Sequence, residues 1–248
     1  MVRTSVTRVT HSCHVIEIGG RTFLTDPWFS QKPAYHPGEP IAFTVPELPH
    51  LDGVLITHHH YDHCDLAALI AYPDHHVPFI VAGPVEARAK KHGFGNAMAL
   101  APWERVEIGG VTITAAPGKH GVYEVTFVIQ GGGDTVYFAG YSLVIPELYE
   151  LPERFGHIDL ALLPTNGLQI RPQLNKQVVM NAAEAAELTS ILKPDLAVPH
   201  HYAFTGGWFA DHFITKGDRD PRHYAEASKI LAPETTVRIV APGEAVVL

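Results

Sequence analysis

The six residues from His58 to His63 constrain the fold of this chain more than any other segment. They read His-His-His-Tyr-Asp-His and follow Gly53 to Thr57, a short apolar stretch rich in branched residues that is typical of a buried strand. Side chains can converge in the turn after a strand, and zinc accepts imidazole nitrogen and carboxylate oxygen ligands at about 2.0 to 2.2 Å. This segment therefore predicts a site for one or two metal ions at a strand end. A solvated histidine-rich loop is the alternative.

The composition narrows the class of protein. The 248 residues are 46% hydrophobic, with 21 glycines and 20 prolines, as in a packed globular protein with many turns. A formal charge of −8 argues against nucleic acid or an anionic membrane surface as the main partner. No apolar stretch reaches the roughly 18 to 20 residues that span a bilayer, and the amino terminus lacks a secretion signal, so we expect a cytoplasmic protein. Cys13 and Cys64 are too few for a disulfide scaffold.

Alternating apolar residues and turn residues predict two groups of strands separated by helices. The expected strands are Ser5–Val9, Cys13–Ile18, Arg21–Thr25, Gly53–Thr57, Phe79–Ala82, Val106–Ile108, Val111–Ala115, Val125–Gln130, Thr135–Phe138, Ile158–Leu163, Leu196–Val198, Thr236–Val240 and Ala245–Leu248. The expected helices are a segment capped by Asp65 and ending at Ala71, Pro84–His92, Asn181–Leu192 and Pro221–Leu231. Scattered prolines predict a long loop from Trp28 to Pro49.

The order of these elements predicts the fold class. Two halves of strands and helices can stack their sheets face to face and leave the helices outside, which gives an α/β, four-layer αββα sandwich. No linker of low complexity separates the halves. We therefore expect residues 1–248 to form a single domain.

Two further histidine sites lie just past predicted strands. They are His120, in Pro117-Gly118-Lys119-His120-Gly121, and the pair His200-His201. With the run from His58 to His63, these residues give a pattern that resembles the metallo-β-lactamase superfamily, whose hallmark is His-x-His-x-Asp-His followed by separated single ligands. The resemblance implies the four-layer sandwich and a metal-dependent hydrolase.

The resemblance covers nearly the whole chain. It is closest to the branch that contains ascorbate 6-phosphate lactonase and N-acyl phosphatidylethanolamine phospholipase D, although the stretches that indicate the branch are less specific than the histidine hallmark. Those stretches are His11-Ser12-Cys13 with Glu17, Thr25-Asp26-Pro27, Leu163 to Gly167, Met180 to Ala186 and Pro199 to Tyr202.

The resemblance implies six metal ligands. They are His58, His60 and His120 for a first ion, and Asp62, His63 and His201 for a second. Ligating imidazoles need a hydrogen-bond partner for their other nitrogen, and Asp26 fits that role, with His11 as a further residue near the site. An ordinary turn residue and a core histidine are the alternatives for these two.

One departure from the family pattern concerns a bridging aspartate. The family usually places it in a Gly-Asp pair after a strand, whereas this chain reads Phe138-Ala139-Gly140-Tyr141-Ser142. Losing a carboxylate removes a negative charge, so the second ion should bind more weakly unless Tyr141 coordinates as a phenolate. A site with two ions and a site with one ion both remain open, with zinc as the first choice and manganese or iron as alternatives.

The expected reaction is hydrolysis of a small-molecule ester, lactone, amide or phosphoester by a metal-activated water. Asp62 is expected to position or deprotonate that water, and Tyr141 completes the predicted catalytic pair. Substrate contacts are expected from loops around the metal, although packing or a solvated surface is the alternative for each residue. These contacts are Trp28, Lys119, Asn166, Arg171, Phe204 and Trp208.

Other functions compete with hydrolysis. An iron-dependent redox enzyme could use the same ligands, since histidine and carboxylate with open positions suit iron. A non-catalytic metal or ligand-binding protein is a second alternative. A nuclease is disfavoured because the chain is acidic and lacks a basic cluster. The sequence leaves the substrate, the metal and a homo-oligomeric state open.

Overall fold

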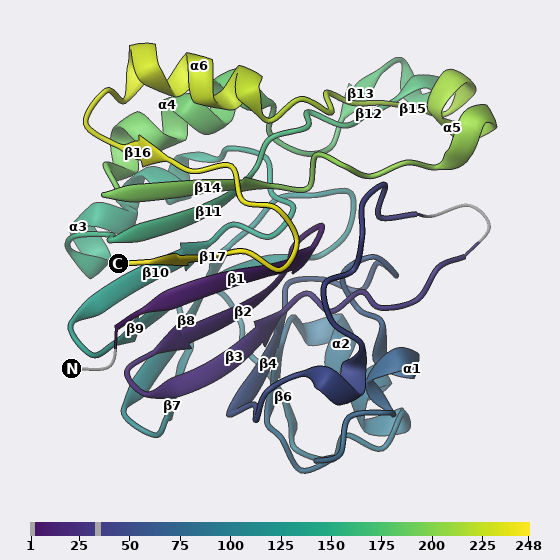
Figure 1. The fold of residues 1–248 in the computed structure, drawn as a ribbon, viewed down its shortest axis with the longest axis vertical. Coiled ribbons are helices and arrows are strands. Elements are labelled where there is room, and N and C mark those ends of the chain that lie inside the picture. Colours follow the sequence, from purple (N-terminus) through teal and green to yellow (C-terminus); the bar gives the residue numbers. More distant parts are fainter. Residues whose placement is uncertain (1–2, 33–35) are drawn as a thin grey trace.

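A computed structural model describes residues 3–32 and 36–248 as two stacked sheets with helices on their outer faces (Figure 1). The first sheet has the strand order β17-β1-β2-β3-β4-β5-β6. Its strands are β1 (Ser5–Thr10), β2 (Cys13–Ile18), β3 (Arg21–Thr25), β4 (Gly53–Ile56), β5 (Phe79–Val81), β6 (Ala97–Ala99) and β17 (Ala245–Val247). Strands β3 to β6 run parallel, and β17, β1, β2 and β3 pair antiparallel.

The second sheet has the order β16-β14-β11-β10-β9-β8-β7. Its strands are β7 (Arg105–Ile108), β8 (Val111–Pro117), β9 (Val125–Gly131), β10 (Asp134–Phe138), β11 (Leu160–Pro164), β14 (Leu196–His200) and β16 (Thr236–Val237). Strands β10, β11, β14 and β16 are parallel, whereas β7 to β10 form an antiparallel meander. Both sheets are therefore mixed.

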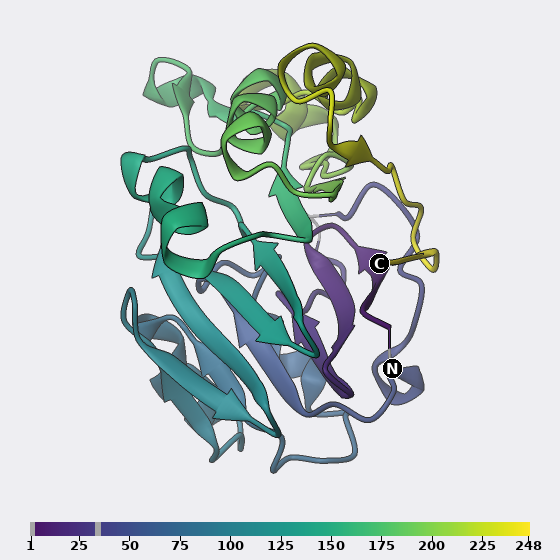
Figure 2. The ribbon, with the colours of Figure 1, turned by 90° about the vertical axis from the view of Figure 1, so that its left-hand side faces the viewer.

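Helices cover the outer faces of the sheets. They are α1 (Leu66–Leu69), α2 (Gly83–Lys91), α3 (Leu151–Phe155), α4 (Ala182–Leu192), α5 (Gly207–Phe213) and α6 (Arg222–Leu231), with 3-10 turns η1 (Val45–Glu47), η2 (Pro146–Glu150) and η3 (Arg171–Gln173). Figure 2 shows the green and yellow C-terminal helices together at one end of the sandwich. In the part of the chain that the structure describes, no helix is both long and apolar enough to cross a membrane.

Alternation along the strands explains the four layers. In β10, Val136 and Phe138 belong to the core between the two sheets, whereas Tyr137 belongs to the core under α4 and α6. In β11, Leu162 belongs to the core between the sheets and Leu163 to the core under α4 and α6. Successive side chains of a strand point to opposite faces, so a strand that is apolar throughout is covered on both sides. The predicted four-layer sandwich is confirmed.

The ends of several strands meet at one edge of the sandwich. Strands β1, β3 and β4 point the same way in the first sheet, as do β8, β10, β11 and β14 in the second. Ligands of open α/β sheets bind beyond the carboxyl ends of the strands. The residues that follow these strands are therefore the ones able to form a common site.

Most predicted elements are confirmed with small shifts at their ends. Asp65 caps α1, since its side chain accepts a hydrogen bond from the backbone nitrogen of Ala68, but that helix ends at Leu69 rather than Ala71. Asn181 caps α4: its side chain accepts a hydrogen bond from the backbone nitrogen of Glu184, and its own backbone nitrogen donates to the Glu184 carboxylate. The predicted strand Thr236–Val240 is shorter, because only Thr236 and Val237 pair with β14.

Several elements have no counterpart in the sequence prediction. Strand β6, helices α3 and α5, and a small sheet of β12 (Gln169–Ile170), β13 (Lys176–Gln177) and β15 (Thr215–Lys216) were not expected. The predicted loop from Trp28 to Pro49 contains no strand or α-helix among its described residues, although it includes η1 and a bridge between His36 and Thr205. Its residues 33–35 lie outside the described residues. The single domain of residues 1–248 stays a prediction.

Candidate metal centre and pocket

Three histidines from the two sheets form the first cluster, which consists of His58, His60 and His120. His58 and His60 follow β4, and His120 follows β8. The Nδ1 atom of His60 lies 3.1 Å from Nε2 of His58 and 3.2 Å from Nε2 of His120. Ligands at about 2.0 to 2.1 Å from a tetrahedral ion are separated by roughly 3.4 Å, so these three nitrogens suit one divalent cation.

Hydrogen bonds fix which nitrogens of the first cluster are free to bind metal. His120 donates from Nδ1 to the carbonyl oxygen of Val178 at 2.8 Å, which leaves the Nε2 lone pair for the cluster. The hydroxyl of Thr57 donates its single proton to Asp26, at 2.7 Å, and so accepts from Nδ1 of His58 at 3.0 Å. His58 therefore also presents a bare Nε2.

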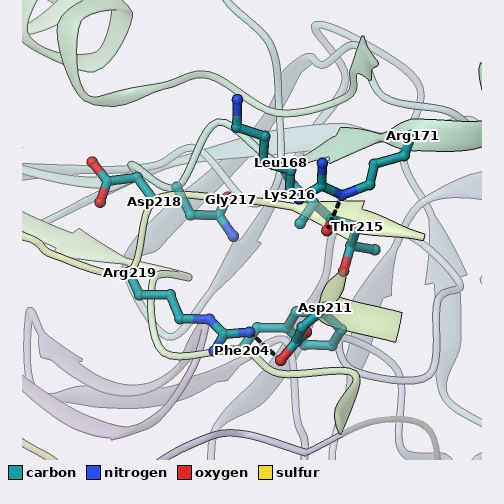
Figure 3. Close-up of a pocket in the computed structure, with 10 residues that line it drawn as sticks. Leu168, Arg171, Phe204, Asp211, Thr215, Lys216, Gly217, Asp218 and Arg219 are labelled. Carbon is teal, nitrogen blue, oxygen red and sulfur yellow. Dashed lines mark hydrogen bonds and ion pairs between the residues drawn. The ribbon is translucent and has the colours of Figure 1, made fainter. Parts of the chain in front are cut away.

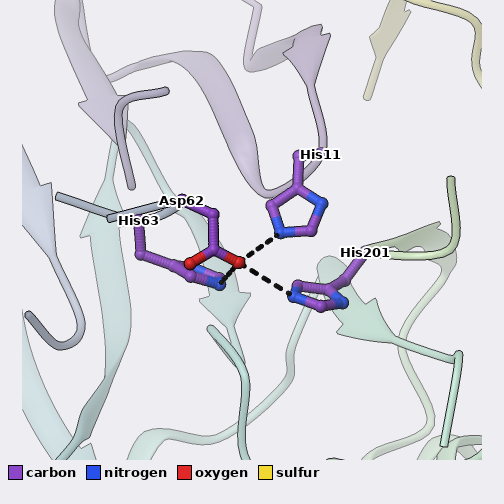
Figure 4. Close-up of side chains that lie close together, drawn as sticks. All are labelled: His11, Asp62, His63 and His201. Carbon is purple, nitrogen blue, oxygen red and sulfur yellow. Dashed lines mark ion pairs between the residues drawn. The ribbon is translucent and has the colours of Figure 1, made fainter. Parts of the chain in front are cut away.

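Four residues form the second cluster: His11, Asp62, His63 and His201 (Figure 4). His11 lies in the turn between β1 and β2, Asp62 and His63 follow β4, and His201 follows β14. One donor atom from each lies within 4.8 Å of the other three. All four residues are buried, with Asp62 the most exposed at 7%.

Asp26 connects the two clusters. Its Oδ2 accepts from Nδ1 of His63 at 2.7 Å and from the hydroxyl of Thr57, which in turn holds His58. Its Oδ1 accepts from the backbone nitrogen of Thr57 at 2.8 Å. One carboxylate after β3 therefore orients an imidazole in each cluster, which is the position that the sequence prediction gave to Asp26.

Burial controls the charges of these side chains. It lowers the pKa of His11 and of His120 to about 4, and it holds the pKa of His58 well below its usual range. Burial opposes ionisation of Asp62, but His63 and His11 outweigh it and lower the pKa of that carboxyl. Burial also opposes the charged form of His63, but Asp62 and Asp26 outweigh it and raise the pKa of that imidazole. The neutral imidazoles of His11, His58 and His120 beside an ionised carboxylate are forms that bind a divalent cation.

Tyr141 stands between the clusters. Its ring centroid lies 4.0 Å from that of His201 and 4.2 Å from that of His120. Its backbone nitrogen donates to Glu124 at 2.8 Å, and the preceding Gly140 has φ +57° with no room for a Cβ, which would meet a Thr57 methyl at 2.6 Å. The position that usually carries the bridging carboxylate is therefore filled by an aromatic ring.

The first cluster opens into a pocket of about 550 Å³. Residues of both clusters line one side of this pocket, and the two clusters together with Asp26 behind them are called the metal floor below. Residues of the small sheet β13-β12-β15 line the pocket as well, and this sheet with α5, which packs beside β15, is called the outer wall. The pocket is lined by His60, Tyr61, Asp62, His120, Gly121, Val122, Tyr141, Leu168, Ile170, Gln173, Lys176, Val178, His201, Phe204 and Thr215.

A second pocket of about 310 Å³ adjoins the first and shares Leu168, Phe204 and Thr215 with it (Figure 3). It contains two of the predicted substrate contacts besides Phe204, namely Asn166 and Arg171. The Arg171 side chain donates to the carbonyl oxygen of Thr215 at 3.2 Å. These two residues therefore lie beside the metal pocket rather than over the clusters.

The other predicted substrate contacts, Trp28, Lys119 and Trp208, line neither pocket. Trp28 is fully buried, with its ring 4.8 Å from that of His11, so it supports the second cluster by packing instead of touching a substrate. Trp208 is 70% exposed on α5 and stacks on His212. Lys119 is exposed next to His120, and its backbone nitrogen donates to Ser142.

Two features of the site were missed or understated by the sequence prediction. Glu124 is completely buried 3.5 Å from Nδ1 of His58, and burial raises the pKa of its carboxyl well above its usual range. Its only sequence signal is a carboxylate between His120 and an apolar strand. His11 was expected merely near the site, whereas its ring is part of the second cluster.

Comparisons with known proteins agree with this fold. A family model described as the beta-lactamase superfamily domain matches residues 21–202. A protein of Caldivirga maquilingensis that is named a metal-dependent hydrolase is 27% identical over 238 residues, which cover 94% of this chain and 93% of that protein.

Solved structures share the fold. Igni18, a metallo hydrolase from Ignicoccus hospitalis, has a TM-score of 0.77 and 22% identity, over 100% of this chain and 99% of that one. CmlA, a diiron beta-hydroxylase from Streptomyces venezuelae, has a TM-score of 0.76 and 20% identity, over 100% of this chain but 55% of that one. Proteins with different named activities therefore share this architecture.

Proposed function

Because the chain belongs to the family of the beta-lactamase superfamily domain, whose curated relatives are named metal-dependent hydrolases, we propose that it hydrolyses a small-molecule ester, lactone, amide or phosphoester. The names of the relatives bear out the class of function predicted from the sequence. A lactone or a related ester is the first choice of substrate, from the resemblance to the lactonase branch.

The observation that carries this proposal is the open first cluster. Nδ1 of His60 lies 3.1 Å from Nε2 of His58 and 3.2 Å from Nε2 of His120. His60 and His120 both line the 550 Å³ pocket. Catalytic zinc sites typically have three protein ligands and one position left for water or substrate. When bound, a divalent cation lowers the pKa of water from 15.7 toward about 7 and polarises the substrate oxygen.

The side chains of the chain supply orientation and proton handling. Asp62 lines the pocket, and we assign its carboxylate to hold the proton of the attacking water. Tyr141 also lines the pocket between the clusters, where its ring limits how a substrate approaches. Leu168, Phe204 and Val178 exclude water from the apolar side of the substrate.

Zinc is the first choice of metal, since the nitrogen-rich clusters suit it, with manganese as an alternative. The test is to strip the purified protein with a chelator, reload it with each metal, and assay an aryl ester, an aromatic lactone and an aryl phosphodiester. We expect turnover of at least one substrate class to return with the metal. A protein that binds metal and turns over none of them would instead be a metal or ligand-binding protein.

An iron-dependent redox enzyme is the second candidate. It is favoured by the histidine and carboxylate clusters and by the tyrosine beside them, and CmlA, part of which has a similar fold, is named a diiron beta-hydroxylase. The protein loaded with iron(II) would then consume oxygen when supplied with a substrate, and the zinc form would be inert. Hydrolysis by the zinc form, with no oxygen uptake by the iron form, decides for the first candidate.

A further inference from the structure

The second cluster differs from the first in having four donor groups instead of three. Oδ2 of Asp62 lies 3.4 Å from Nε2 of His11, 3.6 Å from Nε2 of His63 and 3.9 Å from Nε2 of His201. These separations are too long for strong hydrogen bonds. The first two match the roughly 3.3 to 3.6 Å edges of a tetrahedron around a cation with ligands at about 2.0 to 2.2 Å, and the third is a few tenths of an ångström longer. Figure 4 shows the three rings turned toward the same carboxylate oxygen.

Most ring nitrogens of this cluster are buried without a hydrogen bond, although Nδ1 of His63 is bonded to Asp26. Among the described residues, both ring nitrogens of His11 and of His201, and Nε2 of His63, have no hydrogen-bond partner. Leaving a buried polar atom unpaired costs about 1 to 3 kcal/mol. Several unpaired nitrogens around one carboxylate oxygen are therefore the arrangement expected of ligands for a cation.

The turns that carry His11 and His201 both have a left-handed backbone, and a backbone hydrogen bond joins them. The φ of His11 is +49°, and φ of His201 is +60°, in the left-handed region that most side chains avoid. The backbone nitrogen of His11 donates to Glu39 at 2.8 Å, and its carbonyl oxygen accepts from the backbone nitrogen of His201 at 3.4 Å. Such backbone strain concentrates at functional sites.

We propose that His11 is the fourth protein ligand of the second cluster, and that this cluster is a closed metal site with no position left for substrate. His11 then supplies the ligand that compensates for the absent bridging carboxylate at Tyr141. The first cluster remains the open site at which chemistry occurs. Asp62 would bind the second ion through Oδ2, the oxygen that faces the three rings, and its Oδ1 would remain for the proton of the attacking water. This inference rests on the proposed metal dependence, and it divides the two sites into one that holds its ion firmly and one that exchanges it.

Burial supports this division. His11, His63 and His201 are at most 1% exposed, and the ring of Trp28 closes the far side of His11. Asp62 and His201 border the pocket as well, but they are only 7% and 1% exposed. In the first cluster, His60 and His120 are only partly buried and line the pocket. Closed sites with four protein ligands are typical of structural zinc, whereas three ligands and an open position are typical of catalytic zinc.

The experiment follows metal release from the zinc-loaded protein into excess chelator. We expect two ions per chain, one released rapidly from the first cluster and one slowly from the second. His11→Ala should release the slow ion at least about 100-fold faster, because even loss of a group behind a ligand weakens metal binding by 10 to 100-fold. The rapid phase should be unchanged. Cobalt substitution gives a second readout, since its visible absorption reports the number of ligands.

Two further variants keep the test decisive. His11→Gly suits the left-handed backbone at this position, and added imidazole should restore slow release by filling the space of the missing ring. His14→Gln removes another fully buried histidine of the same sheet and should leave both phases unchanged. The inference is overturned if the His11 variants keep the slow ion and the cobalt spectrum of the unaltered protein. A protein that binds no stoichiometric metal at all would instead refute the proposed function.

Discussion

The metal floor and the outer wall of the pocket are built in opposite ways. The floor comes from residues that follow strands of the two large sheets, and most of its side chains are buried and hydrogen-bonded to fixed partners. The outer wall consists of three strands of two residues each and the short helix α5, whose Trp208 and Phe209 are 70% and 63% exposed. Both regions line the same pocket.

This contrast separates the chemistry from the choice of substrate. Metal binding requires donor atoms placed to within a few tenths of an ångström, which strands packed in a core provide. Substrate recognition tolerates variation, and loops on a rigid scaffold commonly supply it. Changes to the floor should therefore alter metal content and turnover, whereas changes to the wall should alter only the affinity for particular substrates.

The largest effect is expected from removing two ligands of the first cluster. Replacing His58 and His60 by alanine should lower kcat/KM by at least about 1,000-fold, because residual hydrolysis lacks the activated water. The rapidly exchanging metal should be lost as well, as measured by metal analysis after dialysis. The matched control replaces the exposed pair His75 and His76 by alanine. Full metal occupancy in the floor variant would contradict the assignment of this cluster.

The next effect tests whether the two clusters share one support. Asp26→Asn should weaken binding of both ions by about 10 to 100-fold, since an amide cannot accept from the backbone, Thr57 and His63 as the carboxylate does. Metal affinities from competition with a chelator measure this. Asp52→Asn is the control, because it removes a carboxylate that bonds Arg21 and Thr22 at the other end of the sheet. Weakening of one ion alone would show that the clusters are oriented independently.

The floor was far more predictable from the sequence than the wall, for a physical reason. His58 to His63 form a local run after an apolar strand, so spacing alone indicated a metal site at the end of a buried strand. Position after strands marked His120 and the pair His200-His201, and the resemblance to the family selected His120 and His201 as ligands. Glu124 and the full involvement of His11 were missed because both depend on pairings between distant segments, which no local pattern records.

The wall depends almost wholly on such distant pairings. Strand β12 pairs with β15 across more than 40 residues, at Gln169 with Lys216 and Ile170 with Thr215. Strands of two residues are too short for alternation to appear. Helix α5 begins at Gly207 without a side-chain cap, and it exposes its aromatic residues, so neither start signals nor periodicity indicated it.

Burial around the floor should also make stability depend on pH. Burial, reinforced by Arg8, lowers the pKa of His14 to about 3, from an unfolded value of 6.5. The unfolded chain therefore binds a proton that the folded chain rejects, and stability falls as the pH drops from 6.5 toward 3. In the presence of chelator, the free energy of unfolding should fall between pH 7 and pH 5 in both proteins, and the fall should be about 2 kcal/mol smaller in His14→Gln than in the unaltered protein. Urea unfolding at the two pH values measures this, and an identical loss in both proteins would contradict it.

The smallest effect is expected for a residue of the outer wall. It tests most directly whether the outer wall and the metal floor have separate roles. Lys176 is exposed on β13 and lines the metal pocket, so its ammonium group can attract an anionic substrate without touching the floor. Lys176→Ala should raise KM for an anionic ester by up to about fivefold, the equivalent of roughly 1 kcal/mol for an exposed charge pair, and leave kcat, metal content and KM for a neutral ester unchanged. Lys229→Ala, on α6 and away from the pocket, is the control. A fall in kcat or in bound metal would place this side chain in the chemistry and end the separation between floor and wall.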